Sequence, residues 1–158
     1  MNKNSTPVKG YKVTKADWSC APVYSKRKQY SVPGRFTTNT EPSLCNHGMH
    51  FCKKLSDCFT YYPFNPDLVK VAEVVAHGTV VEGEDKCSTN DLEFIREVPW
   101  EEVLRIVNEG KNCTGLRNTG DGNTGSRNTG DGNTGDGTTG NRNTGDRNTG
   151  NKIGRAHV

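Results

Sequence analysis

The chain has 158 residues, of which 30% are hydrophobic and 25% are charged, and its formal net charge at pH 7 is +3. A charge this small and dispersed argues against nucleic acid as a partner. Almost all hydrophobic residues precede Gly110, so only that part can bury a conventional core. We therefore expect a head domain at residues 1–112 and a tail at residues 113–152 that is held together in another way.

Residues 1–7 are polar, and no apolar segment that could act as a signal or cross a bilayer follows them. We therefore expect a cytoplasmic protein without a membrane partner. In that compartment the six cysteines are expected to be free thiols rather than disulfides. The short basic triplet Lys26-Arg27-Lys28 is interpreted as a solvated loop.

The head shows runs of alternating polar and apolar residues, the pattern of β-strands, separated by turn-forming dipeptides such as Pro33-Gly34. The longest β-rich run changes its apolar phase once, which indicates a bulge in a single long strand. The predicted strands are a first around Tyr11 and Val13, then residues 29–32, 49–52, 69–81 with the bulge near Val74-Val75, and 92–98.

Two apolar stripes at helical spacing predict helices in the head. One is ended by Pro63, and the other begins after Pro99 and closes at Gly110. Strands followed by single helices predict an α+β fold with a small, mostly antiparallel sheet and one or two helices. The stripes comprise Leu55, Cys58, Phe59 and Tyr62 in the first case and Trp100, Val103, Leu104 and Val107 in the second.

From Cys113 a triplet that is usually Asn-Thr-Gly recurs every five residues as far as Gly150. So much glycine disfavours a helix, and an odd period would flip the faces of a flat strand at each repeat. Each unit must then contain a corner, which predicts a right-angled β-solenoid with glycine at the corners and Asn stacked on Asn of the next coil. The alternative is a disordered repeat tail, because the array offers little apolar burial against its ordering entropy.

Acidic and basic residues alternate in the array, which argues against mimicry of DNA and favours stacking and solubility. Self-association through the array is a further expectation about partners. The charged residues are Asp121, Asp131, Asp136 and Asp146 against Arg117, Arg127, Arg142, Arg147 and Lys152.

Residues 153–158 abandon the repeat abruptly. Their sequence, Ile-Gly-Arg-Ala-His-Val, looks like the translation of a widely used sequencing adapter. We therefore interpret this segment as a scar of cloning or assembly, expected if the gene was read from a metagenomic or similar fragment, and exclude it from functional reasoning.

The head resembles an uncharacterised domain-of-unknown-function family of phages and bacteria, whose members often carry Asn-Thr-Gly arrays. The resemblance covers most of residues 10–107 and implies a phage or prophage context, with no established activity. It rests on Gly10-Tyr11-Lys12-Val13, Asp17-Trp18-Ser19-Cys20, the run from Leu44 to Cys52, Asp57-Cys58-Phe59, Tyr61-Tyr62-Pro63 and Ala72-Glu73-Val74.

Four side chains of types that bind zinc lie close together in the sequence: Cys45, His47, His50 and Cys52. Their spacing lacks the paired CxxC pattern of structural zinc sites, so we expect no metal and no cofactor. The alternative interpretation is a buried strand with His50 hydrogen-bonded to backbone. Cys58 lies on the apolar helical stripe and is expected in the core.

A nucleophilic cysteine needs a base, and His50 with Cys52 or Cys20 could supply such a couple. The segment from Gly48 to Tyr61 also looks somewhat like part of ADP-ribosyltransferase-type folds, for which His50, Tyr61 and Glu73 would be the residues to test. No other catalytic motif is recognised.

We favour a phage-associated interaction or structural module that acts in the host cytoplasm. Its head would recognise a partner, expected to be a protein, and the array would act as a spacer. The alternative is an enzyme with an ADP-ribosyltransferase-like head that modifies a host component, with the array as a targeting handle.

Overall fold

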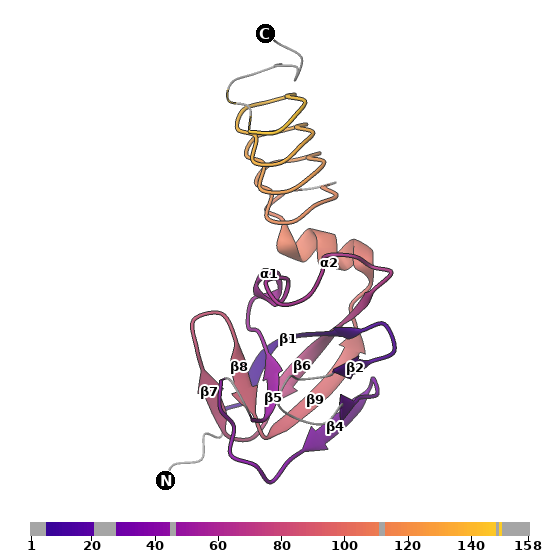
Figure 1. The fold of residues 1–158 in the computed structure, drawn as a ribbon, viewed down its shortest axis with the longest axis vertical. Coiled ribbons are helices and arrows are strands. Elements are labelled where there is room, and N and C mark those ends of the chain that lie inside the picture. The colour runs from indigo at the N-terminus through magenta and orange to yellow at the C-terminus, as the bar shows by residue number, and fades with distance from the viewer. Residues whose placement is uncertain (1–5, 21–27, 45–46, 111–112, 148, 150–158) are drawn as a thin grey trace. The chain divides into compact units, whose positions relative to one another are not determined.

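A computed structural model of the protein describes residues 6–20, 28–44, 47–110, 113–147 and 149. The chain divides into two compact units, Met1–Pro99 and Trp100–Val158 (Figure 1). Among the described residues, no helix is both long enough and apolar enough to span a membrane. The interpretation of residues 153–158 as a scar falls outside the described residues.

The first unit is built from antiparallel strands and one short helix, α1 (Leu55–Cys58). One sheet has four strands, in the order β1 (Val8–Lys15), β6 (Val69–Ala76), β9 (Asp91–Glu97) and β4 (Gly34–Thr37). Another has three, in the order β5 (Met49–Phe51), β8 (Cys87–Thr89) and β7 (Val80–Glu82). The short strands β2 (Ser19–Cys20) and β3 (Lys28–Gln29) pair with each other.

A pair of backbone hydrogen bonds connects the four-stranded and three-stranded sheets. Tyr11 of β1 donates its N–H to the carbonyl of Cys52, which follows β5, and Cys52 donates back, at 2.7 and 2.9 Å. β1 therefore has β6 on one edge and the end of β5 on the other. The prediction of mostly antiparallel sheet with two short helices is confirmed, counting α2 in the second unit.

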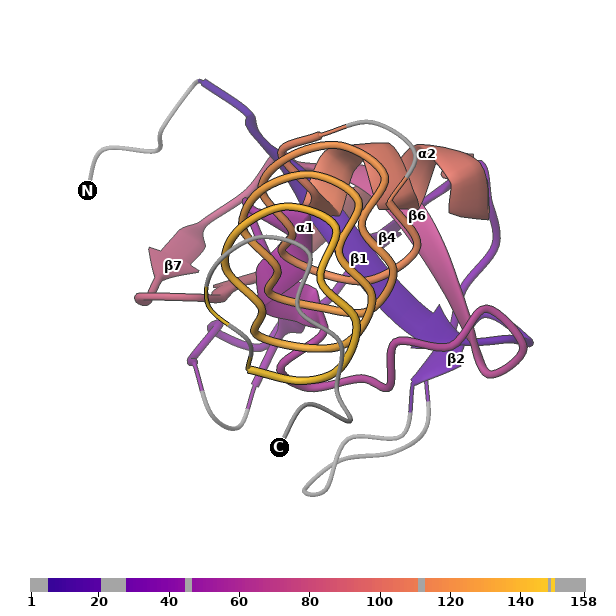
Figure 2. The same ribbon diagram turned by 90° about the horizontal axis from the view of Figure 1, so that it is seen from above.

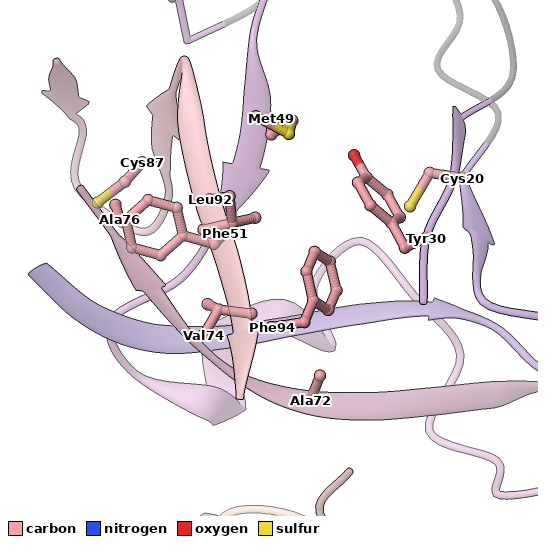
Figure 3. Close-up of a cluster of buried hydrophobic side chains, with 10 residues drawn as sticks. All are labelled: Cys20, Tyr30, Met49, Phe51, Ala72, Val74, Ala76, Cys87, Leu92 and Phe94. Atoms are coloured by element: carbon pink, nitrogen blue, oxygen red, sulfur yellow. The ribbon is translucent and has the colours of Figure 1, made fainter. Parts of the chain in front are cut away.

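The core of the first unit consists of side chains from both sheets and from the β2–β3 pair (Figure 3). Its aromatic centre is Tyr30 stacked on Phe94, with 4.6 Å between ring centroids, and Phe36 edge-on to both rings. Large buried aromatic rings such as Tyr30 and Phe94 stabilise a core strongly, and the partly buried Phe36 packs against them. The buried cluster comprises Cys20, Tyr30, Met49, Phe51, Ala72, Val74, Ala76, Cys87, Leu92 and Phe94.

The predicted long strand at residues 69–81 is wrong in its extent, because the run is divided between two sheets. β6 ends at Ala76, and β7 begins at Val80 in the three-stranded sheet. Between them the N–H of Thr79 donates to Oδ1 of Asn90 at 3.0 Å, outside any ladder. The predicted bulge is confirmed, since the register between β6 and β9 shifts at Glu73/Val74.

Two further predicted elements are shorter in the structure. The strand expected at residues 29–32 is the two-residue β3. The first helix was expected to reach Pro63 but stops at Cys58, because Phe59 and Thr60 donate to carbonyls three residues back, which tightens the chain into turns. β2, β4 and β8 had no predicted counterpart.

The second unit begins with α2 (Trp100–Val107), the helix predicted there, and continues into the repeats. Parallel bridges join Thr119 to Thr129 and Thr124 to Thr134, ten residues apart, so each turn holds two units (Figure 2). A unit that occupies half a turn must reverse the chain direction, so a single right-angled corner in each unit cannot close the turn. The stacked turns fit a solenoid rather than a disordered tail.

Left-handed backbone makes this reversal. The third residue of the triplet is glycine with φ between +102° and +122° at all six units from Gly120 to Gly145. Glycine adopts this conformation without the strain that a Cβ would add. The last residue of most units is also left-handed, as Arg127 is with φ of 59°. The prediction that glycine takes the strained torsions is confirmed.

Candidate functional site

The first unit contains a cavity of about 120 Å³. Side chains from β1, β2, β3 and β5, together with the segment after α1, converge on it. Most of them carry a hydrogen-bond donor, and two carry a positive charge. The lining residues are Lys12, Cys20, Lys28, Tyr30, Gly48, Met49, His50 and Tyr62.

The two lysines enter the cavity from different strands. Lys12 of β1 is only 6% exposed, donates from Nζ to the carbonyl oxygen of His50, and lies 5.7 Å from the centroid of the Tyr30 ring. Lys28 of β3 is half-buried and donates from Nζ to the carbonyl oxygen of Gly48 at 2.9 Å. Burial and then the charge of Lys12 hold the pKa of Lys28 below its usual value.

Neither lysine has a carboxylate within 4.0 Å among the residues that the structure describes. Their described hydrogen-bond partners are neutral backbone carbonyls, Lys12 having the Tyr30 ring in addition. The wall of the cavity therefore carries two positive charges that no described side chain neutralises.

Two tyrosines and a cysteine add neutral donors. Tyr62 Oη and Cys20 Sγ are 3.4 Å apart. Burial, followed by the proximity of Cys20, raises the pKa of both Tyr30 and Tyr62 above the usual value, so both phenols stay protonated at neutral pH. The Tyr30 hydroxyl has no hydrogen-bond partner in the described part of the chain.

His50 of β5 is held by backbone. Its Nε2 lies 3.0 Å from the carbonyl oxygens of both Ser43 and Leu44, so this nitrogen carries the proton and donates to them. Burial, followed by the charge of Lys12, lowers the pKa of His50, which keeps the imidazole neutral at neutral pH. The alternative interpretation of His50 as a histidine bonded to backbone is confirmed.

The other residues expected in a catalytic site lie elsewhere. Interaction with the neighbouring Cys58 side chain lowers the pKa of Cys52, and the Cys58 thiol itself donates to the Tyr11 carbonyl at 3.6 Å. Tyr61 is exposed and donates to the Asp85 carboxylate, which raises the pKa of Tyr61 to about 12. Glu73 pairs with Arg96 at 2.9 Å.

None of Cys52, Tyr61 and Glu73 lines the cavity that His50 lines, whereas Cys20 does. Of the couples expected from the sequence, the structure therefore brings His50 and Cys20 to one cavity. Cys58 is buried in the core as expected.

The four residues weighed as zinc ligands are placed as follows. Cys45 lies outside the described residues. His47 is exposed, and its backbone bonds Ser43 and Ser88. Within the described ranges, no three His, Cys, Asp or Glu side chains are grouped closely enough to hold a metal ion.

Sequence reasoning missed the two lysines. Lys12 lies between Tyr11 and Val13 in the first predicted strand, where alternation would place it on the polar face, but β1 is buried on both faces, with Val13 on one and Lys12 on the other. Lys28 was assigned to a solvated loop, which is wrong, since it is half-buried in β3 and bonds Gly48. Each lysine lies in or beside a β-rich run of the sequence. The alternation of polar and apolar residues alone could not distinguish a buried lysine from an exposed lysine at such a position.

A second feature is the line of buried asparagines in the repeats. Asn133 is completely buried; its Nδ2 donates to the carbonyl of Gly140 at 2.6 Å, and its Oδ1 accepts the N–H of Asn143 at 3.0 Å. The same bonds recur from turn to turn, beginning with Asn108, which accepts the N–H of Asn118. The predicted stacking of Asn on Asn is confirmed, and we call this line the asparagine ladder: Asn108, Asn118, Asn123, Asn128, Asn133 and Asn143.

The family comparisons divide the chain in a similar place. A family described as a domain of unknown function, DUF7666, matches residues 8–106, and pentapeptide repeats in eight copies match residues 106–153. No curated protein and no solved structure matches the chain.

Proposed function

Since the chain belongs to the DUF7666 family and continues into pentapeptide repeats, we propose that it is a non-enzymatic interaction or structural module. In this proposal the head recognises a partner, and the array is a rigid β-solenoid that serves as its spacer. The observation that supports the proposal most directly is the asparagine ladder, because it satisfies buried polar groups turn after turn and so favours a stiff rod over a flexible tether.

The surface of the array supports a role in association. The threonine at the second position of each triplet is exposed on every described turn, and charges of both signs lie among these threonines. We propose a protein as the partner of the head and self-association as a further property of the array. The phage or prophage context rests on the resemblance of the head, and a cytoplasmic location suits the buried free thiols. The enzymatic alternative stays a prediction.

Amide hydrogen exchange on the full chain tests the spacer. Backbone N–H groups of residues 118–145 that bond the next turn should exchange far more slowly than an unstructured chain, because they open only when turns separate. Exchange at random-coil rates throughout these residues would contradict the rigid spacer and leave a flexible tether.

A further inference from the structure

Lys12 is a buried ammonium group whose donors are not all used by the residues that the structure describes. The group has three N–H donors, and the structure gives it one hydrogen bond, to the His50 carbonyl, together with the face of Tyr30. With only 6% of the residue exposed, solvent has little access to the charge. Burying an ammonium without a counter-ion is unfavourable, so the arrangement favours a negative charge brought in from outside.

Lys28 places a second ammonium close to the first. The carbonyls that hold the two, Gly48 and His50, are only two residues apart. Gly48 itself is required at this point, because its φ is +93° and a Cβ there would collide with the Ser88 hydroxyl. The backbone is thus shaped to hold both lysines at one cavity, although their charges repel each other.

The remaining polar groups of the cavity suit an acceptor-rich ligand. The hydroxyls of Tyr30 and Tyr62 are protonated donors, and none of the described residues that line the cavity carries a carboxylate. His50 is neutral and already donates to backbone, so it neither repels an anion nor supplies a negative charge. The volume of about 120 Å³ exceeds that of a single water molecule and admits a small polyatomic ion.

We infer that this cavity binds a small divalent oxyanion, a phosphate ion or the phosphate group of a small molecule, between the ammonium groups of Lys12 and Lys28. Two positive charges match a divalent anion better than a carboxylate, and phosphate oxygens accept the hydrogen bonds that the lysines and tyrosines can donate. The inference concerns the head alone and goes beyond the proposed function, since it does not depend on whether the array is a rigid spacer.

The test is a calorimetric titration of the full chain with inorganic phosphate, glycerol phosphate and acetate at equal ionic strength. We expect saturable binding of phosphate or of its monoester with one site, and binding of acetate at least about tenfold weaker. Preference for the monoester identifies an esterified ligand, and preference for inorganic phosphate identifies the free ion. Acetate binding as tight as phosphate, or no saturation up to about 10 mM phosphate, would overturn the inference.

Two variants and a matched control assign the site. Lys28→Gln should weaken phosphate binding at least about tenfold, since it removes one of the two charges, and Lys12→Met should weaken it further, since it removes the more buried one. Lys9→Gln changes an exposed lysine of the same strand and should bind as the unaltered chain does. Equal weakening by Lys9→Gln and Lys28→Gln would indicate an adventitious surface effect and refute the site.

The thermal midpoint gives a second readout if Lys12→Met folds poorly. Phosphate should raise the midpoint of the unaltered chain and of Lys9→Gln by mass action, and should raise that of Lys28→Gln clearly less. A rise of the same size in Lys28→Gln would refute the site independently of the Lys12 variant.

Discussion

Replacing Asn133 by alanine should loosen the repeats, because this side chain connects three stretches of backbone. Its Nδ2 donates to the carbonyls of Gly140 and Thr129, and its Oδ1 accepts the N–H of Asn143, three hydrogen bonds in all. At about 1 kcal/mol each, their loss is worth about 3 kcal/mol. The true cost should lie at or above this value, because the N–H of buried Asn143 loses its partner.

The assay is amide exchange on the full chain, read at individual residues by NMR. A loss of about 3 kcal/mol corresponds to about a hundredfold faster exchange in the turns around residue 133. Turns of a solenoid contact only their neighbours, so amides of β6 in the head should exchange as before. They serve as an internal standard in the same sample.

Two neighbouring substitutions are the matched controls. Thr134→Ala removes an exposed side chain of the same triplet, and the ladder bonds of Thr134 come from its backbone. Asp136→Ser removes a charge but retains an acceptor, since Ser126 accepts a backbone N–H at the equivalent position. Each should change the opening free energy by less than about 0.5 kcal/mol. If Asn133→Ala changes exchange no more than Thr134→Ala does, the asparagine ladder does not stabilise the array.

Three further predictions follow from particular contacts. Gly135→Ala should abolish protection in the adjoining turns, because φ is +122° there and a Cβ would collide with the carbonyl of Gly145; unchanged protection would contradict the stacking. Thr138→Asn should slow exchange nearby, since threonine at this ladder position lacks the second amide donor; faster exchange would contradict the assignment. Arg35 lowers the pKa of Asp91 below 3.8, so the contribution of this pair is present above pH 3.8 and is lost as pH falls through the lower value in the folded protein. Urea titrations should therefore show Arg35→Met destabilising the chain at neutral pH and progressively less as the pH falls below 3.8, and a loss that does not change with pH would refute the linkage.

The parts of the fold that sequence patterns predicted are those decided by nearby residues. The helix at 100–107, the bulge at Glu73/Val74 and the left-handed glycines follow from local spacing and local backbone preference. The end of β6 at Ala76 could not be predicted in this way. It depends on Thr79, which lies outside both sheets and donates its N–H to Asn90, eleven positions away. A pattern along the chain carries no information about which distant strand will be the partner.

The cavity illustrates the same limit at a functional site. His50 stood out in the sequence because histidine is chemically conspicuous, but the charge in the cavity comes from Lys12 and Lys28, whose neighbours suggested exposure. Both lysines are held by long-range hydrogen bonds, Lys12 to the carbonyl of His50, 38 positions away, and Lys28 to the carbonyl of Gly48, 20 positions away. Local sequence could not predict that β1 would be covered on both faces.

The repeats raise the question of how turns with so little apolar surface stack at all. Burial of a polar side chain opposes folding unless the side chain forms hydrogen bonds. Apolar burial alone therefore does not predict whether the repeats are ordered or disordered. Each interior asparagine offsets this cost by forming hydrogen bonds with backbone groups of the neighbouring turn. Asn133, for example, bonds the N–H of Asn143 and the carbonyl of Gly140. Because the amide both donates and accepts, one asparagine per unit suffices to satisfy the buried hydrogen-bonding groups of the turn. This explains why the position before the threonine is almost always asparagine, while that threonine faces solvent on every turn.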